Sequence, residues 1–267
     1  MSALQTIRIA AEPSALPECP RGKFVVPVLP NPVRKLSLVV PTYQEAENIQ
    51  DFLVEICAVL DQALPSQYAV IVVDDNSPDR TWMKVAQLMP RLPALRMVRR
   101  TDERGLAGAV MRGYQVAEGE ILGTINADFQ HPPQLLRDMI ELSKNADVVV
   151  ASRFCKGGGT GDWPQDRVMM SRVACQAGRF MLPEVFNDVT DPLSGFYMFR
   201  RPVVEGIEFA PVGFKTLIEI LAKGRANKIA ECPYRMRARR HGVSKVTIES
   251  SLAFLKQLRQ LRIGNVS

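Results

Sequence analysis

The sequence has few of the residues from which disulfide frameworks and histidine metal centres are built. Its five cysteines are odd in number, lie far apart and never form a C-x-x-C pair: Cys19, Cys57, Cys155, Cys175 and Cys232. This argues against both a disulfide framework and a zinc site, and it is typical of a protein of the reducing cytosol. His131 and His241 are the only histidines, which excludes a histidine-rich metal centre.

Long hydrophobic runs are also missing. No run approaches the roughly 18 apolar residues that are needed to cross a bilayer. The N-terminus lacks the continuous apolar core of a signal peptide. The sequence therefore predicts neither a membrane span nor a signal peptide.

The composition is that of a soluble globular protein with a basic excess. Of 267 residues, 46% are hydrophobic and 23% are charged, and 34 basic residues face 28 acidic ones, which gives a formal net charge of +6. The length suffices for one α/β domain, with or without appendages. The charge predicts an anionic partner, which can be nucleic acid, phospholipid headgroups or a phosphorylated substrate.

Apolar runs of strand length alternate with amphipathic stretches of helix length. Strands are expected at 36–40, 68–73, 95–98, 121–125 and 148–150, and helices at 49–60, 82–89, 105–116 and 135–142. Beyond Arg153 the pattern is looser, with helices at 165–181 and 214–222 and strands at 196–199 and near Ile229. This alternation predicts an α/β fold with a mostly parallel sheet and helices on both faces.

The chain divides into three parts by composition. Residues 1–34 are rich in proline and lack periodicity, so we expect an irregular, largely disordered leader. Residues 35–245 form the predicted domain, and 246–267 a basic amphipathic C-terminal helix. That helix places Phe254, Leu258 and Leu261 on one side and three basic residues mostly on another: Lys256, Arg259 and Arg262. Such a helix can lie on an anionic bilayer or pack on its own domain, and sequence alone leaves both open.

The most informative stretch follows the strand that begins at Ile121. The strand ends before Pro132-Pro133 and leaves Asn126, Asp128 and Gln130 as oxygen donors. Hard oxygen donors at a strand end suit Mg²⁺ or Mn²⁺ bound to the phosphates of a substrate. The triplet alone is more typical of a polar turn after a core strand, since short motifs match by chance.

Acidic residues follow two other predicted strands. Glu45 comes after the first, and Asp74 and Asp75 come directly after the second. Each alone is typical of a turn or a helix cap. Because the carboxyl ends of parallel strands share one edge, we expect the three clusters to meet in one cleft.

These clusters belong to a larger set of motifs that resembles the family 2 glycosyltransferases. More narrowly, the set is similar to dolichol-phosphate mannosyltransferases and the bacterial enzymes that glycosylate undecaprenyl phosphate. It covers about residues 36–250 in the order of the family. The matching segments are Pro41–Glu45 with Glu47 and Asn48, Val73–Asp79, Gly105–Gly108, Ala127–Pro133, Ala151–Arg153, Trp163 and Pro164 with Arg167, Asp191–Phe196, Gly213–Lys215 with Glu219, and Arg239-x-x-Gly242-x-Ser244-Lys245.

The resemblance implies a GT-A fold that binds a nucleotide diphospho-sugar with Mg²⁺ or Mn²⁺. Base and ribose would be held by Pro41, Tyr43, Glu45, Val73 and Asp75, with the donor site continuing through Asn126, Ala127, Asp128 and Gln130. Asp128 and Gln130 would ligate the metal. Asn126 stands where the family usually has Asp; it still offers an oxygen, but one negative charge is lost, so metal or donor affinity should fall.

The resemblance also implies how the reaction proceeds. With Asp128, the basic residues Arg153, Arg239 and Lys245 would serve catalysis at the diphosphate or the acceptor phosphate, although Arg239 and Lys245 also fit a solvated basic loop. A phosphate acceptor carries close to two negative charges at pH 7 (second pKa about 6), so it attacks without a general base. Direct displacement would invert the anomeric centre.

The expected function is transfer of a hexose, mannose or glucose, from GDP-mannose, UDP-glucose or a similar donor to dolichyl or undecaprenyl phosphate. The protein would be cytoplasmic and peripheral at the cytoplasmic face of the membrane. One alternative, motivated by Asn126, is a catalytically silent nucleotide-sugar-binding subunit. Nucleic-acid binding is a weaker alternative, because the arginine-rich C-terminal region lacks interleaved aromatic residues.

Overall fold

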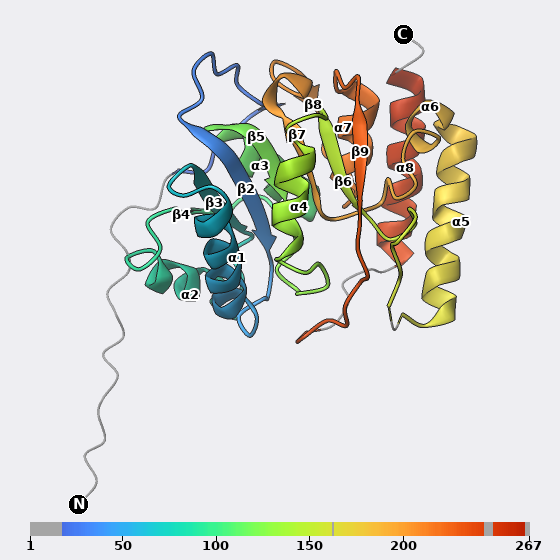
Figure 1. Ribbon diagram of the computed structural model, residues 1–267. Coiled ribbons are helices and arrows are strands. Elements are labelled where there is room, and N and C mark those ends of the chain that lie inside the picture. Colours follow the sequence, from blue (N-terminus) through green and yellow to red (C-terminus); the bar gives the residue numbers. More distant parts are fainter. Residues whose placement is uncertain (1–17, 162, 243–247, 265–267) are drawn as a thin grey trace, which may run out of the picture.

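The computed structural model describes residues 18–161, 163–242 and 248–264. A seven-stranded sheet crosses this part of the chain (Figure 1). In order across the sheet its strands are β4 (Leu95–Arg99), β3 (Tyr68–Asp74), β2 (Arg34–Thr42), β5 (Gly119–Thr124), β7 (Tyr197–Arg200), β6 (Val148–Ser152) and β9 (Ile229–Pro233). Only β7 runs antiparallel to its neighbours, so the predicted mostly parallel sheet is confirmed.

Helices cover both faces of the sheet, so its central strands are buried on both sides. One face packs against α1 (Ile49–Ala63), α2 (Thr81–Leu88) and α4 (Leu135–Leu142). The other packs against α3 (Leu106–Gln115) and α7 (Thr216–Lys223). A third cluster joins α5 (Gln165–Met181), α6 (Pro183–Phe186) and α8 (Ile248–Gly264) to α7 at one end of the molecule (Figure 1).

The leader differs from its prediction where the structure describes it. Strand β1 (Phe24–Val25) pairs antiparallel with β8 (Glu208–Phe209), and Val26 is fully buried beside α3 and β8. Residues 18–33 are therefore part of the domain, whereas 1–17 lie outside the described residues. The sequence did not indicate this, because a two-residue strand has no periodicity and its partner lies far along the chain.

The C-terminal helix forms close to its predicted bounds but uses its apolar face differently. Phe254, Leu258 and Leu261 are buried against α5, α6 and α7. Of the two alternatives that the sequence left open for this apolar side, the structure shows packing on the domain. Among the described residues, no helix has the length and apolar character to span a membrane.

Close packing of α3 on the sheet depends on Gly113. A Cβ atom at this position would lie 2.5 Å from Val39 Cγ1 and 3.1 Å from Val73 Cγ2, in β2 and β3. These valines are fully buried and stiff at χ1, so they cannot rotate away. The helix reaches the sheet only because residue 113 has no side chain.

We expect Gly113→Ala to lower the free energy of unfolding by about 2 kcal/mol, since overpacking a core outweighs the gain in helix propensity. Urea unfolding followed by circular dichroism measures this. Gly159→Ala is the matched control: its Cβ would meet nothing closer than 3.7 Å, and we expect a change within about 0.5 kcal/mol. A Gly113→Ala protein as stable as the original would contradict the packing argument.

Candidate active site

A cavity of about 580 Å³ lies along the carboxyl edge of the sheet. The three predicted clusters meet there, because β3, β2 and β5 are adjacent and parallel. Nine of the residues predicted for the site line this cavity: Pro41, Tyr43, Glu45, Asp75, Asn126, Asp128, Gln130, Arg153 and Arg239.

Two other predicted residues do not line the cavity. The side chains of Val73 and Ala127 pack in the hydrophobic core on opposite faces of the sheet and are not part of the cavity wall. Lys245 lies outside the described residues. Asp74 is also internal: it accepts hydrogen bonds from Thr42 Oγ1 (2.8 Å) and Ser77 Oγ (2.7 Å), and it shapes the turn after β3.

Asp75 is held rigidly at the β3 end of the cavity. Its carboxylate accepts hydrogen bonds from Arg100 Nη1 and from the backbone N–H of Gly105, both at 2.7 Å. Burial raises the pKa of Asp75, and the neighbouring Arg100 opposes that shift. A paired carboxylate with fixed geometry can recognise hydroxyl or N–H groups of a ligand.

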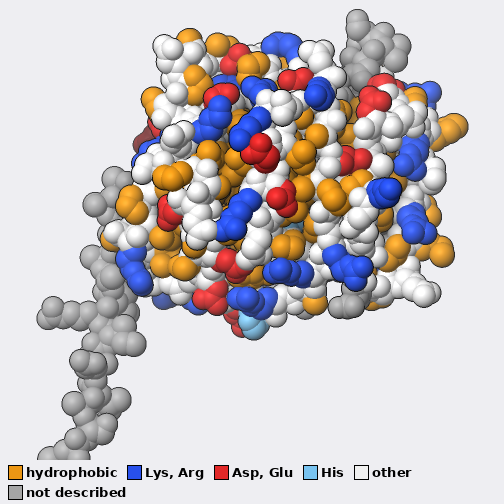
Figure 2. Space-filling model, viewed as in Figure 1, with side chains coloured by type: hydrophobic (Ala, Val, Ile, Leu, Met, Phe, Trp, Pro, Cys, Tyr) orange, Lys and Arg blue, Asp and Glu red, His pale blue; other side chains and the backbone are white. Residues whose placement is uncertain are grey.

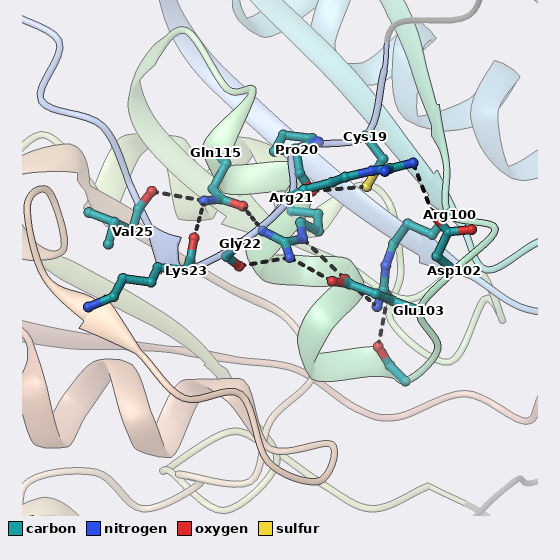
Figure 3. A network of polar contacts seen from close by, with 12 residues as sticks. Cys19, Pro20, Arg21, Gly22, Lys23, Val25, Arg100, Asp102, Glu103 and Gln115 are labelled. Carbon is teal, nitrogen blue, oxygen red and sulfur yellow. Dashed lines mark hydrogen bonds and ion pairs between the residues drawn. The ribbon is translucent and has the colours of Figure 1, made fainter.

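A chain of alternating charges continues from this pair to the N-terminal segment (Figure 3). Arg100 also contacts Glu103 (3.3 Å), and Glu103 receives two hydrogen bonds from Arg112 (2.7 and 3.2 Å). Hydrogen bonding from Arg112 lowers the pKa of Glu103. Arg112 in turn donates to the Gly22 carbonyl (3.0 Å) and lies 4.0 Å from the centre of the Phe24 ring. The N-terminal segment thus supports the wall that carries Asp75.

Asp128 occupies the middle of the cavity, after β5. Its carboxylate pairs with Arg239 Nη2 (2.9 Å) and accepts the backbone N–H of Gln130 (3.1 Å). Burial raises the pKa of Asp128 above its ordinary value, and the positive charge of Arg239 opposes that shift. Arg239 also approaches Glu45 (3.8 Å), so one guanidinium joins the ends of β2 and β5.

The donor set around Asp128 fits a divalent cation bound mainly by a substrate. The described residues contain no group of three or more His, Cys, Asp or Glu side chains arranged to hold a metal ion. One carboxylate with the amide oxygens of Asn126 and Gln130 suits Mg²⁺ or Mn²⁺ whose other ligands are phosphates and water. Gly195 leaves room for Asn126, since a Cβ there would lie 2.6 Å from the amide nitrogen.

Arg153 lines the cavity with its charge already compensated. It forms a two-pronged ion pair with the fully buried Asp191, with both N–O distances 2.7 Å, and its backbone N–H also donates to Asp191 (3.0 Å). The pair fixes the guanidinium as the cavity wall after β6. The ring of Trp163 lies against it, 5.0 Å from its centre to Arg153 Cζ.

Two further cations at this end were absent from the predicted site. Arg167, in α5, lies 4.2 Å from the centre of the Trp163 ring. Lys215 donates to the Leu193 carbonyl (2.6 Å), and burial, with a further contribution from Arg153, lowers its pKa to about 8. Both lie in motifs of the family resemblance, but a single basic residue in a loop or first helical turn has no pattern of its own.

His131 is a buried, neutral member of the cavity wall. Its ring lies between Phe196 and Tyr234, with ring centres 5.7 and 5.2 Å away. Burial, reinforced by the charge of Arg153, lowers its pKa to about 3, so it carries no charge at pH 7.

Comparisons with known proteins identify the family of the chain. The family described as "Glycosyl transferase family 2" matches residues 37–207. The dolichol-phosphate mannosyltransferase of Pyrococcus furiosus is 41% identical over 85% of this chain, although the match spans only 63% of that protein, which is less than two thirds. The Saccharomyces cerevisiae dolichol-phosphate mannosyltransferase is 30% identical over 85% of this chain and 86% of its own.

A solved structure shares the fold. Glucosyl-3-phosphoglycerate synthase of Mycobacterium tuberculosis, in complex with Mn²⁺, UDP and glucosyl-3-phosphoglycerate, aligns with a TM-score of 0.64 at 21% identity. The alignment covers 87% of this chain and 80% of that one. The predicted GT-A fold is confirmed.

The charge chain behind Asp75 yields a stability prediction. We expect Glu103→Gln to lower the free energy of unfolding by about 1–2 kcal/mol, because two buried guanidiniums lose their shared anion. This is below the roughly 3–5 kcal/mol of a fully buried pair, since the Glu103 side chain is 38% exposed. Glu141→Gln, which breaks an exposed pair with Lys144, is the control and should change stability by less than about 0.5 kcal/mol. Equal effects in urea unfolding would refute the supporting role of Glu103.

Proposed function

The chain belongs to glycosyl transferase family 2, and we propose that it transfers mannose from GDP-mannose to the phosphate of a polyprenyl phosphate. The observation that carries this proposal is the order of groups along one cavity. Asp75 lies at the β3 end, Asp128 and Arg239 in the middle, and Arg153 at the β6 end. A nucleoside, a diphosphate and a second phosphate meet suitable partners in that order. The names of the relatives support mannose and a polyprenyl acceptor.

In this proposal the donor lies along the β3 to β5 part of the edge. Asp75 accepts hydrogen bonds from the nucleoside, and Pro41 and Tyr43 form the wall beside it. Asp128 with Gln130 and Asn126 would hold Mg²⁺ or Mn²⁺, which neutralises the charge that develops on the departing diphosphate. Arg239 shares that task, since it already reaches Asp128.

The acceptor phosphate would lie at the β6 end of the cavity, among Arg167, Lys215 and the rigid Arg153. Its oxygen attacks the anomeric carbon and the nucleoside diphosphate leaves from the opposite face, so the configuration inverts. A phosphate needs no general base at pH 7, and His131 is neutral and free of that role. Closely placed cations lower the repulsion between the two phosphate groups.

The polyprenyl chain requires an apolar surface near this end, and α5 and α8 provide one. Four large apolar side chains of α5 face solvent, with Phe180 83% exposed; the others are Met169, Met170 and Val173. Leu252, Leu255 and Ile263 of α8 add to them. Basic side chains lie among apolar ones at this edge of the molecule (Figure 2). We propose that this face, rather than the buried face of α8, contacts an anionic membrane surface.

The enzymatic proposal predicts transfer of radiolabelled mannose from GDP-mannose to dolichyl or undecaprenyl phosphate in the presence of Mn²⁺. We expect chelation of the metal to abolish transfer and Asp128→Asn to slow it about 10²–10³-fold, since the carboxylate that would hold the metal at the diphosphate is lost. The labelled lipid is measured after organic extraction.

Asp138→Asn, on the exposed surface of α4, is the control and should transfer at the original rate. Nucleotide binding without transfer from GDP-mannose would refute the enzymatic proposal and favour a silent binding subunit. Transfer from UDP-glucose in preference to GDP-mannose would refute the donor assignment alone.

The membrane surface is tested separately. We expect Met170→Asp with Phe180→Asp to weaken co-sedimentation with phosphatidylglycerol vesicles about tenfold or more, because two apolar side chains no longer insert. Val54→Asp, at a 50% exposed apolar position of α1, is the matched control and should bind vesicles as the original does. Equal loss in both proteins would show that α5 has no special role.

A further inference from the structure

The N-terminal segment, residues 18–26, is attached to the domain at several points, although it lies before residue 37, where the family match begins. Gln115 donates to the carbonyls of Lys23 (2.9 Å) and Val25 (3.2 Å), and Val26 is fully buried. None of residues 18–26, all of which the structure describes, lines the cavity. The segment can therefore affect a ligand only through the residues that it contacts.

One buried side chain, that of Arg112, joins this segment to the cavity wall. It donates to the Gly22 carbonyl (3.0 Å), and the Phe24 ring packs on its guanidinium. The same guanidinium donates to both carboxylate oxygens of Glu103, from Nη2 to Oε1 (2.7 Å) and from Nε to Oε2 (3.2 Å). Because a guanidinium is a rigid planar group, the positions of the segment and of Glu103 are coupled (Figure 3).

Glu103 and Asp75 share a second cation, Arg100. Asp75 holds Arg100 Nη1 at 2.7 Å, whereas Glu103 Oε2 lies 3.3 Å from Arg100 Nη2. Arg112 satisfies Glu103 and so leaves the short bond from Arg100 to Asp75. Without Arg112, the Glu103 carboxylate would turn to Arg100 and weaken its hold on Asp75.

The loop between β4 and α3 carries this effect to the cavity. Its residues Arg104 and Gly105 line the cavity, and the Gly105 N–H donates to Asp75 (2.7 Å). Gly105 has a φ of +117°, which side-chain-bearing residues rarely adopt, and a glycine contributes no side chain to fix the loop. The position of this N–H therefore depends on the contacts of Arg100 and Glu103.

We propose that the N-terminal segment, acting through Arg112, sets how tightly the cavity holds the nucleoside of the donor. Arg112 is a positioning residue: it keeps Arg100 and Gly105 on Asp75, which receives the nucleoside in the proposed function on which this inference rests. The nucleoside does not react, so its binding contributes equally before and during transfer. Loosening Asp75 should therefore raise KM for the donor and leave kcat unchanged.

The first test measures GDP binding with Mn²⁺ by isothermal titration calorimetry on the full chain. We expect Arg112→Met to weaken GDP about tenfold and to raise KM for GDP-mannose by the same factor, with kcat within about twofold. Should that variant not fold, Phe24→Ala removes only the ring on the guanidinium and should weaken GDP about threefold. Lys23→Met is the matched control in the same segment: it breaks an exposed pair with Glu208, directed away from Arg100 (Figure 3), and should bind GDP as the original does.

The second test needs no ligand. Arg104 is exposed, so tryptic cleavage after it, followed by mass spectrometry, reports how often the loop opens. We expect Arg112→Met to speed this cleavage about tenfold. Leu60→Ala, in the core near the start of β3, is expected to be at least as destabilising and controls for lost stability. It should change neither the cleavage after Arg104 nor the affinity for GDP.

The outcomes separate this inference from the function on which it rests. If the original protein binds neither GDP nor GDP-mannose, the proposed function fails, and the cleavage rate still decides whether Arg112 holds the loop. If the original binds GDP and Arg112→Met binds it equally well, the inference is overturned while the function stands. The same follows if Leu60→Ala loses as much affinity, or if kcat falls with KM unchanged.

Discussion

The cavity depends on the requirement that a charge removed from water must have a partner. Asp75 pairs with Arg100, Arg153 with Asp191, and Asp128 with Arg239. Each pair ties the end of one strand to a loop from elsewhere, because an unpaired buried charge would be strongly destabilising. The same pairs hold the polar groups in fixed directions before any ligand arrives. Preorganised groups of this kind are what stabilises a developing charge without further rearrangement.

Much of the fold was readable from the sequence because its signals are local. The helices over Leu135–Leu142 and Gln165–Met181 begin and end where the pattern placed them. The family, predicted from the motif order, is also confirmed. What the sequence could not reveal depends on distant partners: the β1–β8 pairing, and the burial of the apolar face of α8 by α5, α6 and α7. The two-residue strand β1 leaves no periodic trace, and the apolar stripe of α8 does not reveal which surface covers it.

The candidate site shows the same division. Acidic residues at strand ends predicted the cavity, since strand order alone brings Glu45, Asp75 and Asp128 to one edge. The partners of charged residues were hidden, because ion pairs such as Arg153 with Asp191 are set by tertiary packing. The sequence placed Arg153 in the site but could not show that Asp191 holds its guanidinium in a fixed position there.

Because the pKa of Lys215 is about 8, a rise in pH has two opposite effects: it weakens the attraction of this residue for phosphate and raises its contribution to folding stability. Below that value the ammonium is protonated and attracts phosphate; above it the amine is neutral, and this attraction is lost. Between about 8 and the ordinary value of 10.5, the unfolded chain keeps a proton that the folded chain has released. Folding stability from this residue therefore rises with pH across that window. Mild alkali should therefore weaken the attraction of Lys215 for an anionic ligand while the contribution of this one residue to folding stability rises.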